Sequence, residues 1–208
     1  MDAKFFLQSI AIGFSIAAPV GPIGVLCIRR TLANGRRSGL FSGLGAATAD
    51  ATYGMVAAFG LSFVSAFLIN QQVWLQLVGG LFLGYLGLKI FLAAPAAIEP
   101  GATQSNATGD FASTFLLTLT NPATILSFTA IFAGLGLANT GGDYRAASLM
   151  VLGIFFGSAL WWVTLSGVVG LFRHKFTPQR LRWVNRLAGT VILGFGLLIL
   201  ASIYKFTL

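Results

Sequence analysis

The chain has 208 residues, of which 56% are hydrophobic and 9% are charged, and its net charge is +8. Soluble domains carry about 25% charged residues, so this composition excludes a soluble globular protein and indicates a membrane protein. One cysteine and one histidine exclude an intramolecular disulfide and a His/Cys metal cluster, and no metal or other cofactor is expected. The positive charge lies in loops beside apolar segments, a pattern that sets membrane orientation, so nucleic acid is not expected as a partner.

Six apolar segments are each long enough to cross a lipid bilayer, which takes about 20 residues of helix. They cover residues 5–28, 38–65, 73–94, 111–138, 146–172 and 184–205. The first is expected to be retained, because it is too long for the apolar core of a signal peptide. Residues 95–110 are rich in Pro, Ala, Gly, Ser and Thr and are predicted to form a flexible linker. We therefore predict an all-α, polytopic fold in which residues 1–208 form one transmembrane domain.

Basic residues predict the orientation of these helices. The loop after the first segment carries four arginines, and the loop after the fifth carries Arg173, Lys175, Arg180, Arg182 and Arg186. Six spans place these two loops on the same side of the membrane. Because basic loops face the cytoplasm, we predict a bacterial inner-membrane protein with the linker inside and both termini outside the cytoplasm.

The two halves of the chain show an internal repeat. A shift of 110 residues places five residues on identical ones, and these are Leu77, Gly79, Leu83, Gly84 and Leu88 on Leu187, Gly189, Leu193, Gly194 and Leu198. A shift of 100 places Pro22 on Pro122. Each half holds three spans, so the second copy would be inverted relative to the first. We predict inverted repeats at 1–94 and 111–208, the arrangement of many secondary transporters. The alternative is that apolar segments share Leu and Gly by chance.

Two prolines and two glycines interrupt the first apolar segment, at Pro19, Gly21, Pro22 and Gly24. Proline removes a backbone donor and glycine tolerates non-helical angles, so the helix is expected to break here. At membrane depth a break is tolerated where the freed groups face protein or a water-filled cavity. If a half-helix starts after Gly21, its free amides suit a carboxylate, which makes these residues candidates for substrate binding. A simple kink is the alternative.

Asp50 is the acidic residue that lies well inside a predicted span. It lies 12 residues past Ser38, or about 18 Å along a helix, close to the middle of the bilayer. A charge is costly there, so this carboxyl group is a candidate to take up and release a proton during transport. Thr48 and Tyr53 lie nearby and could gate or wall a cavity. The alternative is an acid that ties helices together.

Asn121 and Pro122 interrupt the fourth apolar segment in the same way. The amide of Asn121 and the hydroxyls of Thr124 and Ser127 would line a polar cavity if they face the first break. They are therefore candidates for substrate binding. Ser and Thr in membrane helices often bond their own backbone, which is the structural alternative for each hydroxyl taken alone.

Trp161 and Trp162 lie near the middle of the fifth segment, away from the interfaces where tryptophan concentrates. They could wall or gate the cavity, and packing against lipid is the alternative. The small-residue motif Gly80-x-x-x-Gly84 could pack helices within one chain or between the two chains of a homodimer. No nucleophile with a nearby histidine, phosphate loop or pair of carboxylates is visible, so an enzyme is not expected.

These motifs resemble those of the lysine exporter (LysE) family of translocators. The run APVGPIG at 18–24 followed by two arginines, the stretch 39–54 with Asp50, and the run TNP at 120–122 carry the resemblance. It implies secondary export of amino acids or related metabolites from the bacterial cytoplasm, with Asp50 and the two breaks in the functional roles. Exporters of basic amino acids in this family tend to carry an acid where this chain has Ser127. A neutral amino acid or another small zwitterion is thus as plausible a substrate as lysine or arginine.

The sequence therefore predicts a secondary transporter that exports amino acids or similar zwitterions by proton antiport through Asp50. One alternative is a six-helix transporter of metal ions or redox equivalents from the same superfamily. A thiol mechanism needs two cysteines, however, and the chain has Cys27 alone. Another alternative is a membrane scaffold, which has no need of a midplane acid or of paired breaks.

Overall fold

The computed structural model describes residues 2–19, 21–58, 71–93, 106–121, 124–125, 127–128 and 144–206. Their regular structure is helical, which confirms the predicted all-α class for this part of the chain. The helices are α1 (Asp2–Ala17), α2 (Pro22–Asn34), α3 (Arg36–Ala58), α5 (Gln72–Leu92), α6 (Ala107–Leu119), α8 (Tyr144–Leu171), the short 3-10 helix η1 (Arg173–Lys175) and α9 (Pro178–Phe206).

Three helical stretches are long and apolar enough to cross a membrane: Val73–Leu92, Tyr144–Lys175 and Pro178–Ile203. The pair α1 and α2 is a fourth candidate if the two helices are counted as one span, with a bend of 82° at the break between them. The described parts of the predicted second and fourth spans are α3 and α6, and neither meets the same requirement of length and apolar character. α3 is rich in small and polar side chains, and α6 has 13 residues. The six spans and the inverted repeats therefore remain predictions.

The predicted flexible linker, 95–110, overlaps the beginning of α6. Asn106 Oδ1 accepts a hydrogen bond from Gly109 N (3.1 Å), and the carbonyl of Asn106 accepts one from Asp110 N (2.8 Å). An asparagine at this position satisfies amide donors that the first turn of a helix leaves free, and so fixes where the helix begins. Residues 107–110 are therefore helical, and Asp110 belongs to α6 rather than to a linker.

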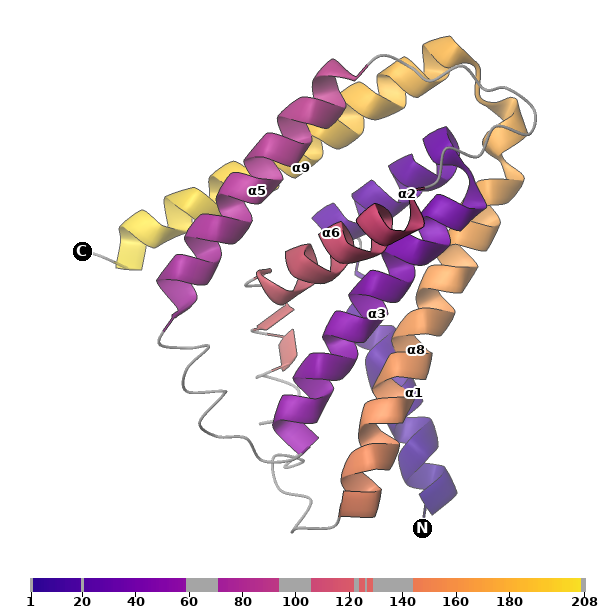
Figure 1. Ribbon diagram of the computed structural model, residues 1–208, viewed down its shortest axis with the longest axis vertical. Helices are drawn as coiled ribbons and strands as arrows, with labels where there is room; N and C mark the ends of the chain where they lie inside the picture. The colour runs from indigo at the N-terminus through magenta and orange to yellow at the C-terminus, as the bar shows by residue number, and fades with distance from the viewer. Residues whose placement is uncertain are drawn as a thin grey trace.

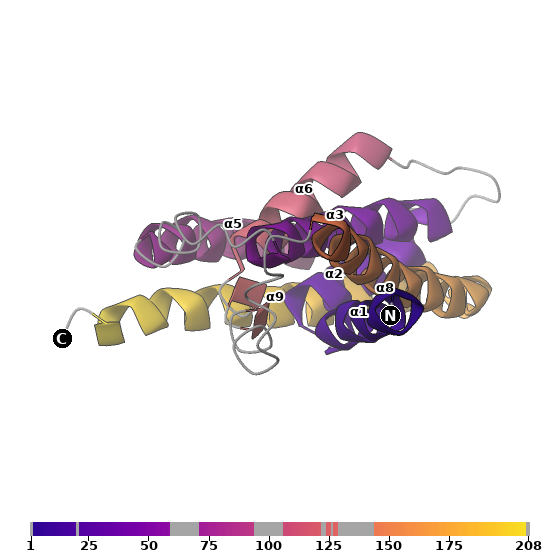
Figure 2. The same ribbon diagram turned by 90° about the horizontal axis from the view of Figure 1, so that it is seen from below.

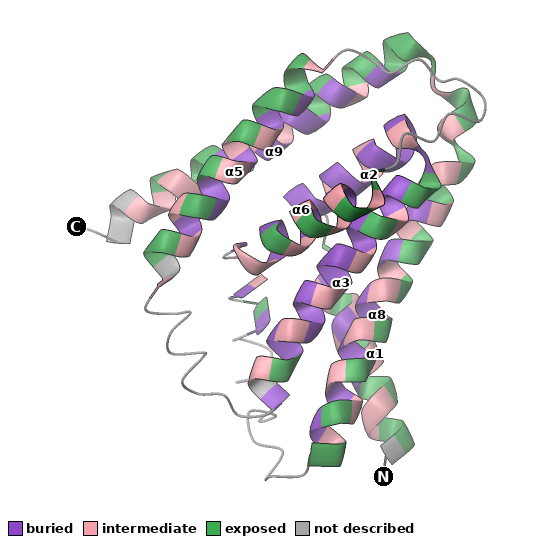
Figure 3. Ribbon diagram, in the orientation of Figure 1, coloured by how far each residue is buried: buried purple, intermediate pink, exposed green. Residues whose placement is uncertain are grey.

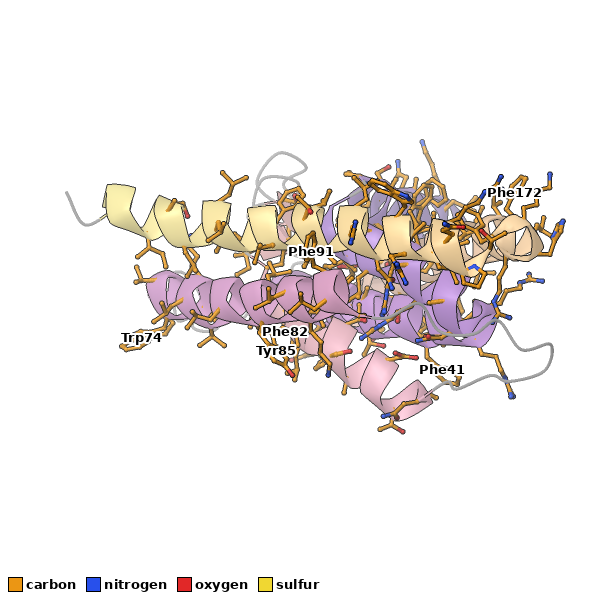
Figure 4. The ribbon with its side chains drawn as sticks, turned by 90° about the horizontal axis from the view of Figure 1, so that it is seen from above. Phe41, Trp74, Phe82, Tyr85, Phe91 and Phe172 are labelled. Carbon is orange, nitrogen blue, oxygen red and sulfur yellow. The ribbon has the colours of Figure 1, made fainter. Side chains whose placement is uncertain are left out.

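The helices pack in two groups. α1 runs along α8, and α3 packs against both α8 and α6, while α5 and α9 form a separate pair (Figure 1). Seen from below, α6 and α1 lie on opposite sides of the α3–α8 pair (Figure 2). α2 and α3 are largely buried, whereas α5 and α9 keep an exposed outer face (Figure 3). On that face Trp74 and Tyr85 point away from α9, as expected of side chains that contact lipid (Figure 4).

Glycines allow α1 and α8 to touch. A Cβ added at Gly157 would lie 2.0 Å from the backbone oxygen of Ile10, and one at Gly13 would lie 2.2 Å from that of Ile154. Side-chain atoms do not approach a backbone so closely, so both contacts require glycine. Small residues serve the same purpose in membrane helices generally. This packing holds α1, and with it the first break, against α8.

The motif of Gly80 and Gly84 is used in part within the chain. A Cβ at Gly80 would lie 2.8 Å from Leu200 Cγ on α9, whereas one at Gly84 would meet no atom within 4 Å. Gly80 therefore brings α5 close to α9 in the same chain. The homodimer remains a prediction.

A buried ion pair joins α2 to α6. Arg30 Nε lies 3.2 Å from Asp110 Oδ1, and the two side chains are 9% and 10% exposed. The Nη1 group of the arginine also donates to Ser42 Oγ on α3 and to Thr114 Oγ1 on α6, both at 2.9 Å. The carboxylate in turn accepts from Ser38 Oγ at 2.6 Å. Buried charges are tolerated when they are paired and hydrogen-bonded in this way, so the cluster fixes three helices at one end of the molecule.

The two predicted cytoplasmic loops lie together at this end. Arg173, which follows α8, donates from Nε to the backbone oxygen of Leu32 on α2 (3.3 Å). Arg29 on α2 donates from Nε to Asn185 Oδ1 on α9 (3.0 Å), and Asn185 Nδ2 donates to the oxygen of Ala93 after α5 (3.4 Å). The predicted orientation requires these ends to share one side, although the side of the membrane that they face remains a prediction.

Gly157→Val is expected to force α1 and α8 apart, because the new side chain collides with the backbone of Ile10. Overpacking of this kind costs about 1–3 kcal/mol, so the melting temperature of the detergent-purified protein should fall. Gly84→Val is the matched control, since a Cβ there meets no neighbour. Equal melting temperatures for the two variants would contradict the close contact between α1 and α8.

Asp110→Asn is expected to lower the free energy of unfolding by about 3–5 kcal/mol, because it leaves the buried charge of Arg30 without a partner. The double variant Arg30→Met/Asp110→Leu removes both charges and should recover much of this loss. Thermal unfolding in detergent compares the three proteins. A single variant as stable as the unmodified protein would show that the ion pair does not hold these helices together.

Candidate functional site

The first helix break lies where the prolines and glycines predict it. Gly21 is the N-cap of α2 in an extended conformation (φ −105°, ψ −164°), and Pro22 is the first helical residue. Gly21 provides no side-chain cap, and the first bond inside the helix is donated by Val25 N to Gly21 O at 3.0 Å. The amides of Ile23 and Gly24 precede that bond, so they have no acceptor within the helix.

The second break follows α6. Thr124 N and Ile125 N both donate to the carbonyl of Asn121, at 3.0 and 3.2 Å, so a new helical turn begins there. Thr124 and Ser127 lie in helical backbone, and Asn121 is buried. Pro122 lies outside the described residues.

Both breaks face one cavity, whose volume is about 330 Å³. The described residues that are predicted to bind substrate or a proton all line it, and these are Pro19, Gly21, Pro22, Gly24, Asp50, Asn121, Thr124 and Ser127. Trp162, a predicted wall or gate residue, lines it as well. Phe195 and Ile199 of α9 complete the wall with apolar surface, and neither is among the residues predicted for the site. No lysine, arginine or histidine is among the described lining residues. The cavity therefore combines one carboxyl group with neutral polar groups and an apolar side.

Asp50 lies in the wall between α3 and α8 and is 3% exposed. Its Oδ2 accepts a hydrogen bond of 2.7 Å from Ser158 Oγ, and Ser158 Oγ accepts one of 3.2 Å from Trp162 Nε1. Ser158 is not among the residues predicted for the site, because it is one of several hydroxyl residues on α8 and its sequence context does not distinguish it from Ser148 or Ser166. Within the described ranges, no group of His, Cys, Asp and Glu is arranged to hold a metal ion.

Three residues predicted as cavity wall or gate lie elsewhere. Thr48 donates to a carbonyl one turn earlier in its own helix (2.8 Å), as hydroxyls in apolar helices often do. Tyr53 donates to the backbone oxygen of Leu119 and so joins α3 to the end of α6. The ring of Trp161 packs edge-to-face on Phe14, with centroids 5.4 Å apart. Tyr53 and Trp161 therefore join helices that surround the cavity, and none of the three is among the described residues that line it.

Comparison with known proteins gives a consistent result. The family model of the LysE type translocator matches residues 14–202. The "Putative amino acid efflux protein YcgF" of Bacillus subtilis is 32% identical over 198 residues, which cover 93% of each chain. The threonine efflux protein of Salmonella typhimurium is 23% identical over 212 residues, or 97% of this chain and 100% of the relative. No solved structure matches the chain.

The match to the family model extends across both helix breaks, Asp50 and the apolar helices. It confirms the resemblance that the proline motifs and the acid in the second apolar segment indicate. The chain therefore belongs to the LysE type translocator family of membrane transporters.

Proposed function

We propose that this protein exports an amino acid or a similar small zwitterion across the bacterial inner membrane by proton antiport. The observation that carries the proposal is the cavity in which two helix breaks and a buried carboxyl group meet. The relatives named as amino acid and threonine efflux proteins support an amino acid as the class of substrate.

The two ends of a zwitterion have matching groups in the cavity. The free amides of Ile23 and Gly24 lie at the positive end of the α2 dipole, which suits a carboxylate. The carboxylate of Asp50 suits an ammonium group, because charge-assisted hydrogen bonds are strong. Asn121 and Thr124 add neutral hydrogen-bonding groups at the second break. A substrate with one carboxylate and one ammonium group would leave no charge unpaired in this cavity.

Asp50 couples export of the substrate to import of a proton, because one carboxylate oxygen cannot hold a proton and an ammonium group together. The ionised form binds the substrate from the cytoplasm and releases it outside. The carboxyl group then takes up an external proton, and the neutral form re-exposes the cavity to the cytoplasm without moving an unpaired charge through the membrane. Release of the proton inside regenerates the carboxylate.

The basic end of the molecule is proposed to face the cytoplasm, with both termini outside. This end holds Arg29 and Arg173 and lies beside the ion pair of Arg30 and Asp110. The excess of arginine in these loops supports that orientation, because basic loops are retained on the cytoplasmic side.

Asp50→Asn is expected to abolish efflux of a labelled amino acid driven by a pH gradient in proteoliposomes, because an amide does not exchange a proton. The variant should still insert and purify as a single species, since Asn is close to Asp in volume. Asp2→Asn, at the first residue of α1, is the control and should retain full transport. Efflux by Asp50→Asn at the unmodified rate would remove Asp50 from the mechanism.

Neutral amino acids are expected to compete with labelled threonine for efflux, whereas lysine and arginine compete weakly, because one carboxyl group cannot pair with two cations. Ser127→Asp would place a second carboxyl group in the cavity wall and should strengthen competition by lysine. Ser148→Asp, on an exposed part of α8, is the matched control. Strong lysine competition in the unmodified protein would contradict a site for neutral zwitterions.

A further inference from the structure

Asp50, Ser158 and Trp162 form a chain of hydrogen bonds that has one direction. An indole N–H is a donor and never an acceptor, so Ser158 Oγ accepts from Trp162 Nε1 at 3.2 Å. The serine proton is thereby directed to Asp50 Oδ2, at 2.7 Å. Because the serine already occupies Oδ2, Oδ1 is the oxygen that is more open to a proton. Among the described residues, no donor is bonded to Oδ1.

Packing holds this chain in place. Ser158 is completely buried and Trp162 is 5% exposed. A Cβ at Gly43 on α3 would lie 2.3 Å from Trp162 Cβ, so the glycine lets the tryptophan rest directly on the backbone of α3. The indole is therefore fixed against the helix that carries Asp50, while part of it also lines the cavity.

Among the described residues, Ser158 is the polar side chain that bonds to Asp50. Tyr53, one turn later on α3, donates its hydroxyl to Leu119 O instead. The ion pair near Ser42 lies about 12 Å of helix away from Asp50. The other charged or titratable groups on α3 and on the helices packed against it do not bond to Asp50, and these are Cys27, Arg29, Arg30, Arg36, Arg37, Asp110, Tyr144 and Arg145.

We propose that Ser158 and Trp162 are positioning residues that reserve Oδ1 of Asp50 as the single site at which proton and substrate ammonium exchange. The proposal rests on the function proposed above and adds two residues to it. Trp162 acts through Ser158, because it prevents the serine hydroxyl from turning to accept a proton from neutral Asp50. The pair therefore favours the carboxylate over the neutral acid.

Ser158→Ala is expected to shift the pH profile of amino acid efflux in proteoliposomes upward by about one pH unit, since the carboxylate loses the donor that stabilises it. Trp162→Phe keeps the ring in the cavity wall but removes the N–H, and should shift the profile in the same direction. The double variant should shift no further than Ser158→Ala, because the indole acts through the serine. Ser158→Thr retains the hydroxyl and should have the same pH profile as the unmodified protein.

Matched controls exist on the same helix. Ser166 is as fully buried as Ser158 but faces Cys27, and Trp161 neighbours Trp162 but packs on Phe14. Ser166→Ala and Trp161→Phe should therefore leave the pH profile unchanged. A profile that shifts equally in the controls, or in neither Ser158→Ala nor Trp162→Phe, would overturn the proposal.

A second readout does not depend on transport. In a Trp74→Phe/Trp161→Phe/Trp183→Phe background, Trp162 is the remaining indole, and its fluorescence should titrate with Asp50. The titration should vanish in Asp50→Asn and move upward in Ser158→Ala. This titration without efflux of any amino acid would refute the proposed function and keep the positioning role. Efflux of an amino acid, combined with the same fluorescence titration in Ser158→Ala and in the unmodified protein, would refute the positioning role and keep the proposed function.

Discussion

Unpaired backbone groups and charges are expensive in a bilayer, and this cost decides where the chain can interrupt its helices. The break before α2 frees two amides, and the turn at Asn121 interrupts a second helix. Residues at both breaks line the same cavity. The glycine contacts between α1 and α8 and the close packing of α3 on α8 hold the walls around these groups. The breaks therefore need a polar cavity for their free backbone groups, and residues at the breaks also form part of its wall.

Two buried acids illustrate how partners decide the behaviour of a charge. Asp110 meets the guanidinium of Arg30 and the hydroxyl of Ser38, so its charge is balanced and its helix is fixed. Asp50 meets the hydroxyl of Ser158 among the described residues, and no cation balances it. The first arrangement is suited to a permanent structural contact. The second leaves a carboxyl group whose charge can be balanced by a proton or by a substrate, which is what exchange requires.

The sequence predicts local features of this protein better than contacts between distant segments. Prolines and glycines mark the first break, and an acid inside an apolar run marks Asp50, because each feature is unfavourable in an ordinary membrane helix. Ser158 lies 108 positions from the acid that it contacts, and a buried serine carries no comparable signal. Asp110 looks like part of a polar linker until the cap at Asn106 places it in a helix. Thr48 and Trp161 illustrate the converse, since they neighbour site residues in sequence but satisfy their contacts elsewhere.

In the proposed mechanism, a proton and an amino acid compete for one carboxyl group in the cavity. Calorimetric titration of the detergent-purified protein with threonine, repeated in buffers of different ionisation enthalpy, measures the protons released when the amino acid binds. Competition for Asp50 predicts proton release that is greatest at acidic pH, where the carboxyl group starts protonated, and that disappears as the pH rises. Binding of the amino acid without proton release at any pH would contradict it.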